Sequence, residues 1–330
     1  MADELVVVAG AGGFIGGHLV AALRRQGCNL RAIDVKPLHQ WEQSFAGVQN
    51  VVADLREREA CEHACRDATE VYNLACDMGG IGFIESHRAE CMISVLINTH
   101  LLLAARDAGV GRYFYASSAC VYNAAKQQSA AAAPLCEDDA YPAMAEDGYG
   151  WEKLFSERMC RHFREDFGLE TRVARFHNVY GPHGTWDGGR EKAPAAICRK
   201  VIAAQRNGER EIEIWGDGRQ SRSFMYITDC LHGIGRIMAS DIREPINLGS
   251  SELVSINELV DLAEEIAGVR LERKYRLDAP QGVAGRNSDN TKIRGYLGWE
   301  PSIPLRTGLA ETYRWIAAEY RRSHSFAKAA

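Results

Sequence analysis

The stretch that decides the fold is Gly10-Ala11-Gly12-Gly13-Phe14-Ile15-Gly16, which directly follows the apolar run 5–9. A glycine-rich turn between a buried strand and a helix permits a sharp bend and a close approach to a bound pyrophosphate. The helix that follows offers backbone N–H groups and positive potential to the phosphates. We therefore predict dinucleotide contacts from Gly10, Gly13, Phe14, Ile15 and Gly16.

A carboxylate stands where the cofactor ribose would lie. Asp34 ends the second apolar run, residues 30–34. A carboxylate at that position accepts hydrogen bonds from both ribose hydroxyls and repels a 2′-phosphate, so it favours NAD over NADP. The alternative is an exposed aspartate at a strand end with no ligand.

Outward from this turn, short apolar runs alternate with longer amphipathic stretches. The runs that predict strands are residues 5–9, 30–34, 48–53, 71–75, 113–116 and 171–175. The stretches that predict helices are residues 14–25, 56–65, 93–108 and 149–166. This alternation predicts an α/β fold built on a doubly wound parallel (Rossmann) sheet of about seven strands.

Beyond Asn178 the alternation loosens, and Gly, Pro and Trp cluster in residues 180–189. Later patterns predict helices at 193–204, 229–239, 255–267 and 305–320 and a strand at 211–215. We therefore predict two domains. Residues 1–175 plus roughly 223–252 form the NAD-binding domain, and residues 176–222 plus 253–330 form a smaller, discontinuous α/β substrate lobe.

Composition excludes several classes of protein. The 330 residues carry a net charge of −5, which argues against nonspecific nucleic-acid binding. We find no run of 18 apolar residues and expect no membrane span. The ten cysteines are scattered, and Cys61 and Cys65 with His63 are too few ligands for a metal site. A reduced, cytoplasmic compartment is therefore expected, with no bound metal.

The catalytic signal is Tyr149-Gly150-Trp151-Glu152-Lys153. Residues four apart on a helix share a face, so the Lys153 ammonium is expected to lower the pKa of the Tyr149 phenol and hold the nicotinamide ribose. Ser118 follows the preceding strand and is the expected third member, polarising the oxygen that is oxidised. Taken alone, the Tyr/Lys pair could also be an amphipathic surface pair.

The spacing of Gly10, Gly13 and Gly16, together with the Tyr/Lys motif, resembles the extended, sugar-nucleotide branch of the short-chain dehydrogenase/reductase superfamily. The resemblance implies adenine contacts from Asp54 and Leu55 and a cofactor contact from Leu74. Related 4,6-dehydratases carry an acidic pair at the positions of Ala119 and Cys120, which this chain lacks. The Cys120 thiol is a plausible carbon base, although an arbitrary cysteine is more often a buried structural residue.

Two longer stretches, residues 73–84 and 175–196, resemble the GDP-mannose 3,5-epimerases. The resemblance implies Cys120 as carbon base, Lys192 as the opposing acid, and Arg222 and Arg286 as diphosphate clamps. The substrate contacts that it implies are Gly79, Ser118, Cys120, Asn178, Glu191, Lys192, Ala193, Lys200, Gln220, Arg222 and Arg286. The chain departs from the family pattern at Cys76, Asn123 and Ala284 and in residues 85–91.

The expected reaction is NAD-dependent epimerisation of GDP-mannose at C3 and C5 through a 4-keto intermediate, giving GDP-L-galactose, GDP-L-gulose or both. A 5-epimerase that gives only GDP-L-gulose, a nucleotide-sugar 4-epimerase and a non-enzymatic NAD-binding regulator remain alternatives. The 4-epimerase would need only Ser118, Tyr149 and Lys153.

We also expect a homodimer, because the predicted helices 93–108 and 149–166 form an intersubunit four-helix bundle in related enzymes. They carry apolar residues beyond one sheet-facing stripe, namely Leu101, Leu102, Phe155 and Met159.

Overall fold

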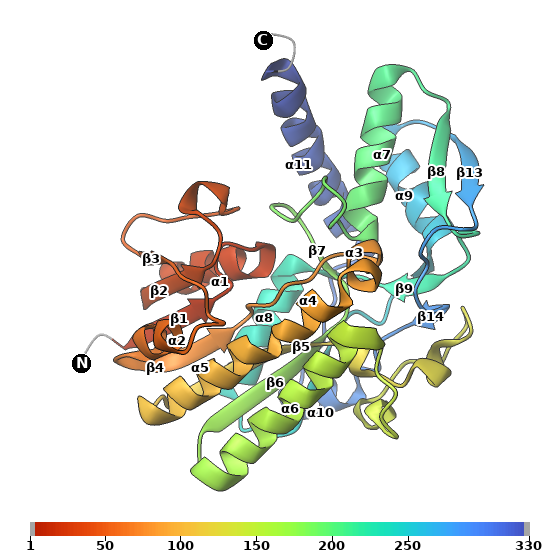
Figure 1. Ribbon diagram of the computed structural model, residues 1–330. Helices are drawn as coiled ribbons and strands as arrows, with labels where there is room; N and C mark the ends of the chain where they lie inside the picture. Colours follow the sequence, from red (N-terminus) through yellow and green to blue (C-terminus); the bar gives the residue numbers. More distant parts are fainter. Residues whose placement is uncertain (1–3, 327–330) are drawn as a thin grey trace.

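The computed structural model describes residues 4–326, and within them one parallel sheet of seven strands has the order β11-β6-β5-β4-β1-β2-β3 (Figure 1). The strands are β1 (Leu5–Ala9), β2 (Asn29–Asp34), β3 (Gln49–Val52), β4 (Ala68–Asn73), β5 (Arg112–Ser118), β6 (Glu170–Phe176) and β11 (Ile246–Leu248). Every pairing between neighbours is parallel. Because β1 lies inside the sheet and the chain winds outward from it on both sides, the predicted doubly wound sheet is confirmed.

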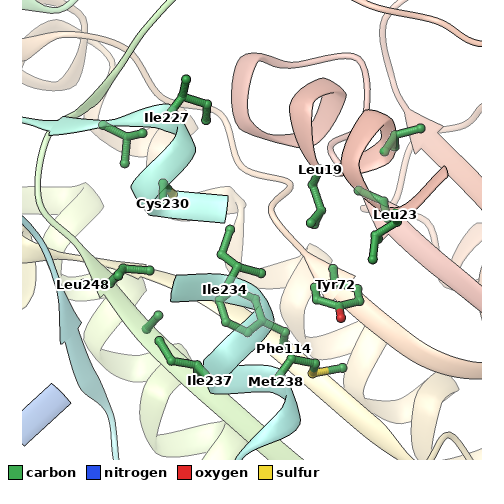
Figure 2. Close-up of a cluster of buried hydrophobic side chains, with 14 of the residues drawn as sticks. Leu19, Leu23, Tyr72, Phe114, Ile227, Cys230, Ile234, Ile237, Met238 and Leu248 are labelled. Atoms are coloured by element: carbon green, nitrogen blue, oxygen red, sulfur yellow. The ribbon is translucent and has the colours of Figure 1, made fainter. Parts of the chain in front are cut away.

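Helices cover both faces of this sheet. One face carries α1 (Phe14–Arg25) and α8 (Ile227–Ala239), and the other carries α2 (Arg58–Cys65), α5 (Val95–Asp107) and α6 (Asp147–Phe167). Figure 2 shows how the first face is filled. Leu19 and Leu23 of α1 and Ile234 of α8 pack in one buried cluster with the sheet residues Tyr72 and Phe114. Burial of both sheet faces explains the nearly continuous apolar runs of the strands.

A second group of elements has its own apolar core. Helices α7 (Ala193–Asn207), α9 (Ile256–Ala267) and α11 (Leu305–Phe326) share this core with β8 (Glu211–Trp215), which pairs in parallel with β13 (Glu272–Arg276). Short strands β12 (Leu253–Ser255), β9 (Ser221–Ser223) and β14 (Gly285–Arg286) form a small sheet. Figure 1 shows α7, α9 and β8 together on one side of the molecule. The residue limits of the two predicted domains remain a prediction.

Several short elements had no sequence signal. They are α3 (Ile81–Ser86), α4 (Arg88–Ile93), α10 (Thr291–Leu297), β7 (Val179–Tyr180) and β10 (Met225–Tyr226). The sheet strand β11 was also not identified individually. Such elements are too short for a periodic pattern, and their positions depend on contacts made by the folded chain.

One helical stretch, Arg88–Asp107, is long and apolar enough by length and composition to cross a membrane. Helices α4 and α5 make up this stretch, and 39% of its most apolar window is buried in the protein. Helix α5 packs against α2 and α6, as a core helix of a globular protein does. The expected absence of a membrane span therefore remains a prediction.

Candidate active site

A cavity of about 1280 Å³ runs from the glycine-rich turn past the ends of β4 and β5 to α7, β8 and β9. Among the predicted site residues, those that line it are Gly10, Gly13, Phe14, Ile15, Gly16, Asp34, Asp54, Leu55, Leu74, Gly79, Ser118, Cys120, Tyr149, Asn178, Glu191, Lys192, Ala193, Lys200, Gln220, Arg222 and Arg286. Lys153 does not line the cavity. It lies behind Tyr149, fully enclosed by the protein.

The glycine-rich turn forms a cradle that side chains would fill. Gly10 has φ +82°, and a Cβ there would lie 2.9 Å from backbone atoms of Leu74 and Ala75. A Cβ on Gly16 would lie 2.1 Å from the carbonyl oxygen of Gly10. Gly13 precedes α1 without a side-chain cap, and the first turn of α1 has no acidic residue. The first N–H groups of the helix are therefore free to bind a pyrophosphate, which fits the phosphates of NAD.

The carboxylates for the adenosine half lie in the same cavity. Asp34 accepts hydrogen bonds from the backbone N–H groups of Gly12 (3.0 Å) and Lys36 (3.0 Å), which fix its side chain at the end of β2. Asp54 is held by Arg56, whose Nε lies 2.9 Å and 3.0 Å from the two carboxylate oxygens. This hydrogen bonding lowers the pKa of Asp54. Both positions fit a nucleoside with a free 2′-hydroxyl.

Tyr149 and Cys120 come together because Gly150 allows α6 to approach the turn that follows β5. A Cβ on Gly150 would lie 2.3 Å from the carbonyl oxygen of Cys120. The backbone N–H of Glu146 donates to that same oxygen at 2.9 Å. Ser118 ends β5 and accepts a hydrogen bond from the Cys120 N–H (3.2 Å). The sequence Tyr-Gly therefore places the phenol, the hydroxyl and the thiol in one part of the cavity.

Burial governs the protonation of the Tyr/Lys pair. The Lys153 Nζ lies 5.6 Å from the centre of the Tyr149 ring and 4.7 Å from that of Tyr115. Burial raises the pKa of the Tyr149 phenol well above its ordinary value; Cys76 and Cys120 act in the same direction, and a hydrogen bond with Ser118 opposes them. The expected lowering of the phenol pKa by Lys153 is therefore not the net effect in this chain.

Lys153 remains a cation in this environment. Burial acts to lower the pKa of its ammonium, but Cys76 and Glu152 act to raise it, and the net shift is upward. The nearest carboxylate oxygen, Oε2 of Glu152, lies 3.7 Å from Nζ. A buried ammonium behind the phenol stabilises a phenolate whenever one forms.

The Cys120 thiol faces a guanidinium. Arg286 donates from NH1 to the Cys120 sulfur at 3.6 Å and from Nε to Gln127 at 2.7 Å, and it forms an ion pair with Glu146. Its role as a diphosphate clamp remains a prediction. In this structure, its side chain contacts Cys120, Gln127 and Glu146. No sequence signal pointed to Glu146.

Lys192 immediately precedes α7, and Pro194 lies in the first turn of that helix. Burial lowers the pKa of its ammonium, and Cys120 and Cys76 oppose this shift. A lysine whose pKa is lowered in this way exchanges protons more readily near neutral pH than an exposed one. Lys192 and Cys120 both line the cavity, which places the two predicted acid/base groups in one site.

The predicted substrate contacts surround the other end of the cavity. Asn178 has φ +38°, a strained value for a residue other than glycine, and its amide donates to the Ser223 carbonyl at 3.0 Å. Lys200 donates to the Glu213 carbonyl at 2.9 Å. Burial lowers the pKa of Arg222 to about 10, and its guanidinium donates to the Gln281 carbonyl at 3.2 Å. A cation held in such a position favours a diphosphate.

The cavity also contains residues that the sequence analysis missed. Arg56, Glu146 and Trp215 line it. Arg56 directly follows the predicted pair Asp54-Leu55, so that adjacency was an available signal. Trp215 ends β8 and Glu146 directly precedes α6, but a single aromatic or acidic residue at such a position is uninformative without contacts.

Comparisons with known proteins agree with this geometry. Residues 6–249 match the model of the NAD dependent epimerase/dehydratase family. A GDP-mannose 3,5-epimerase from Arabidopsis thaliana is 45% identical over 96% of this chain and 83% of its own length. The structure of MoeE5 in complex with UDP-glucose and NAD is 29% identical, with a TM-score of 0.79 over 96% of this chain and 99% of that one.

A UDP-glucose 4-epimerase from Thermotoga maritima shares the fold, with a TM-score of 0.86 and 24% identity over 96% of this chain and 100% of that chain. The predicted cofactor, NAD, is confirmed by the family match and by the structural relative that holds it. The identity to the Arabidopsis relative extends over nearly the whole chain, beyond the cofactor-binding motifs. The chain belongs to the NAD dependent epimerase/dehydratase family and, within it, to the GDP-mannose 3,5-epimerases.

Proposed function

We propose that this chain epimerises GDP-mannose at C3 and C5 through a 4-keto intermediate and releases GDP-L-galactose, GDP-L-gulose or both. The observation that carries the proposal is the placement of Cys120 and Lys192 in the same cavity as Tyr149. A 4-epimerase has no use for this additional acid/base pair. The 45% identity to a GDP-mannose 3,5-epimerase supports the choice of substrate.

The residues divide the chemistry between them. NAD, when bound, supplies the acceptor for the C4 hydride and later the donor that returns it. Tyr149 removes the C4 hydroxyl proton, and Lys153 stabilises the phenolate form from behind the ring. Ser118 forms a hydrogen bond with the C4 oxygen. The neutral phenol, which burial favours, is the form that protonates the C4 oxygen when the ketone is reduced again.

Inversion is the work of the second pair. A 4-keto group acidifies the hydrogens at C3 and C5. Cys120 removes one such proton, and Lys192 delivers a proton to the opposite face of the same carbon. Arg222 and Gln220 hold the diphosphate, with Asn178, Lys200 and the remaining substrate contacts around the sugar nucleotide. Overall, the reaction is an isomerisation, because the hydride leaves and returns within one turnover.

Incubation of the purified protein with GDP-mannose tests the proposal. We expect GDP-L-galactose and GDP-L-gulose among the products, identified by sugar composition after hydrolysis. A product inverted only at C5 identifies the 5-epimerase alternative. A product inverted only at C4 identifies a 4-epimerase, and no new hexose identifies the non-enzymatic alternative.

The ten cysteines are all free thiols in the described part of the chain. This supports the proposal of a cytoplasmic location, where thiols are kept reduced.

We further propose that the protein is a homodimer through α5, α6 and the neighbouring α4. These helices pack side by side (Figure 1). The expected interface residues need correction, because Leu101 and Leu102 are fully buried against the sheet. Phe155, by contrast, is 57% exposed. Other large apolar side chains exposed on these helices are Met92, Ile93, Leu96 and Trp151.

Replacing Phe155 with arginine is expected to turn the dimer into a monomer, because a charge in the centre of an apolar interface is costly to desolvate. Light scattering at micromolar concentration should give twice the chain mass for the wild type and a single chain mass for this variant. Leu277→Arg is the control, since Leu277 is also exposed but lies after β13, far along the chain from these helices. A monomeric wild type would contradict the proposal.

A further inference from the structure

Two distant stretches of the sequence are joined at the mouth of the cavity. Arg190 NH1 lies 2.6 Å from Oδ1 of Asp77. The same guanidinium lies over the ring of Phe83, with its central carbon 3.8 Å from the ring centre. These residues connect the segment around α3 with the loop that leads into α7. Figure 1 shows α3 beside that loop.

The backbones of the two segments are in direct contact as well. The N–H of Gly80 donates to the carbonyl oxygen of Arg190 at 3.0 Å. A Cβ on Gly80 would lie 2.4 Å from the carbonyl oxygen of Glu191. Any residue larger than glycine at position 80 would therefore push the loop away. The ion pair, the ring contact, the hydrogen bond and the close approach all act on the residues immediately before Lys192.

The other side of the loop is anchored to α7. Arg199 of α7 donates to Oε1 of Glu191 at 2.8 Å, and the N–H of Gly189 donates to Oε2 at 2.7 Å. Gly188 and Gly189 have φ +90° and +86°, so without these anchors the loop has considerable backbone freedom. Lys192 thus lies between the first residue of α7 and a glycine-rich loop.

We propose that Arg190, held by Asp77 and Phe83, is a positioning residue that fixes the Lys192 ammonium for proton transfer to the sugar. This inference rests on the proposed function, in which Lys192 is the acid. Arg190 lines the cavity, but its guanidinium is engaged by the Asp77 carboxylate and the Phe83 ring. It acts through the backbone of Glu191 and Lys192, which it fastens to the segment that carries Asp77 and Gly80.

The ion pair contributes little to the stability of the fold. The side chains of Arg190 and Asp77 are 47% and 44% exposed, so water screens the attraction between their charges. The position of a proton donor matters more, because a displacement of about 1 Å can cost about 10²-fold in rate. Loss of the clamp should therefore affect chemistry far more than the melting temperature.

The test uses Arg190→Ala and the milder Asp77→Asn in the full-length, NAD-loaded protein with GDP-mannose in deuterated water. We expect solvent deuterium at C3 and C5 to enter about 10- to 100-fold more slowly than in the wild type. Formation of enzyme-bound NADH in a single turnover should be unchanged, and so should KM. The double variant Asp77→Arg/Arg190→Asp, which restores the ion pair, should recover part of the lost rate.

A second readout does not depend on turnover. In hydrogen exchange without substrate, the Gly80 amide should lose protection in Arg190→Ala. Its acceptor is the backbone carbonyl of residue 190, and this variant removes the side chain that anchors that part of the loop. The matched control is Arg306→Ala, which removes another exposed ion pair between distant segments, with Glu265 at 2.9 Å, away from the cavity. It should leave every readout unchanged.

Three outcomes separate the possibilities. Wild-type deuterium incorporation in Arg190→Ala overturns the positioning role. Equal losses of NADH formation and deuterium incorporation also overturn it, because they indicate a role in substrate binding. A wild type that labels neither C3 nor C5 overturns the proposed function instead. In that case, unchanged hydrogen-exchange protection of the Gly80 amide in Arg190→Ala also overturns the clamp.

Discussion

Replacing Cys120 with alanine is expected to abolish inversion at C3 and C5 while hydride transfer from C4 continues. Cys120 acts only after the 4-keto sugar exists, so binding and oxidation do not need its thiol. Loss of a positioned base costs about 10²–10⁴-fold in rate. The measurement is turnover of GDP-mannose in deuterated water, with the label at C3 and C5 determined by NMR or mass spectrometry.

The control for this variant is Cys28→Ala, which also exchanges a half-buried thiol for a methyl group but lies immediately before β2, outside the cavity. It should incorporate deuterium as the wild type does. Enzyme-bound NADH should form in both variants after GDP-mannose is added. A Cys120→Ala protein that inverts C5 at nearly the wild-type rate would show that Cys120 is a packing residue.

The cofactor half of the site was predictable because its requirements are local. Gly10 needs its positive φ and Gly16 its missing side chain within a single strand–turn–helix unit. The Tyr149/Lys153 pair is similar, since a spacing of four residues on a helix places both on one side. The sheet followed from the alternation of apolar runs and amphipathic stretches, which is also a local pattern.

The side-chain pairings in the site could not be predicted from the sequence, because they are contacts between distant segments. The contact of Arg286 with Cys120 joins residues 166 positions apart. The clamp of Arg190 on Asp77 spans 113 positions. Neither pairing leaves a periodic or spacing signal. The error at Leu101 and Leu102 has a related cause, because α5 is buried against both the sheet and α2, so its core-facing stripe is wider than one sheet face requires.

The raised pKa of Tyr149 affects its two roles differently, as the base in the oxidation of C4 and as the proton donor in the return step. A buried neutral phenol is a poor base until positive charge is close to it, and Lys153 is the cation that this chain supplies. Because the base is the phenolate, hydride transfer should become faster as the pH rises. The same environment favours the neutral phenol as proton donor in the return step, which limits escape of the 4-keto sugar.

Replacing Tyr149 with phenylalanine should block the reaction one step earlier than Cys120→Ala does. Without the hydroxyl, no group accepts the C4 proton, so hydride transfer should fall by about 10²–10⁴-fold. No 4-keto sugar then forms, and the hydrogens at C3 and C5 are no longer acidic. We therefore expect neither enzyme-bound NADH nor deuterium at C3 and C5, whereas Cys120→Ala should show NADH without deuterium.

The order of these two losses is what distinguishes an epimerase with a separate carbon acid/base pair from one that uses only the Tyr/Lys pair. Tyr275→Phe is the matched control, because Tyr275 lies in β13, outside the cavity. The change removes an exposed phenol hydroxyl that donates a hydrogen bond to Asn257 at 3.1 Å. It should leave NADH formation, its pH dependence and deuterium incorporation unchanged. If Tyr149→Phe forms NADH at the wild-type rate, another group removes the C4 proton, and the position of Lys153 behind the ring serves only packing. If it forms no NADH yet labels C5, inversion does not pass through a ketone at C4, and the roles of Cys120 and Lys192 lose their chemical basis.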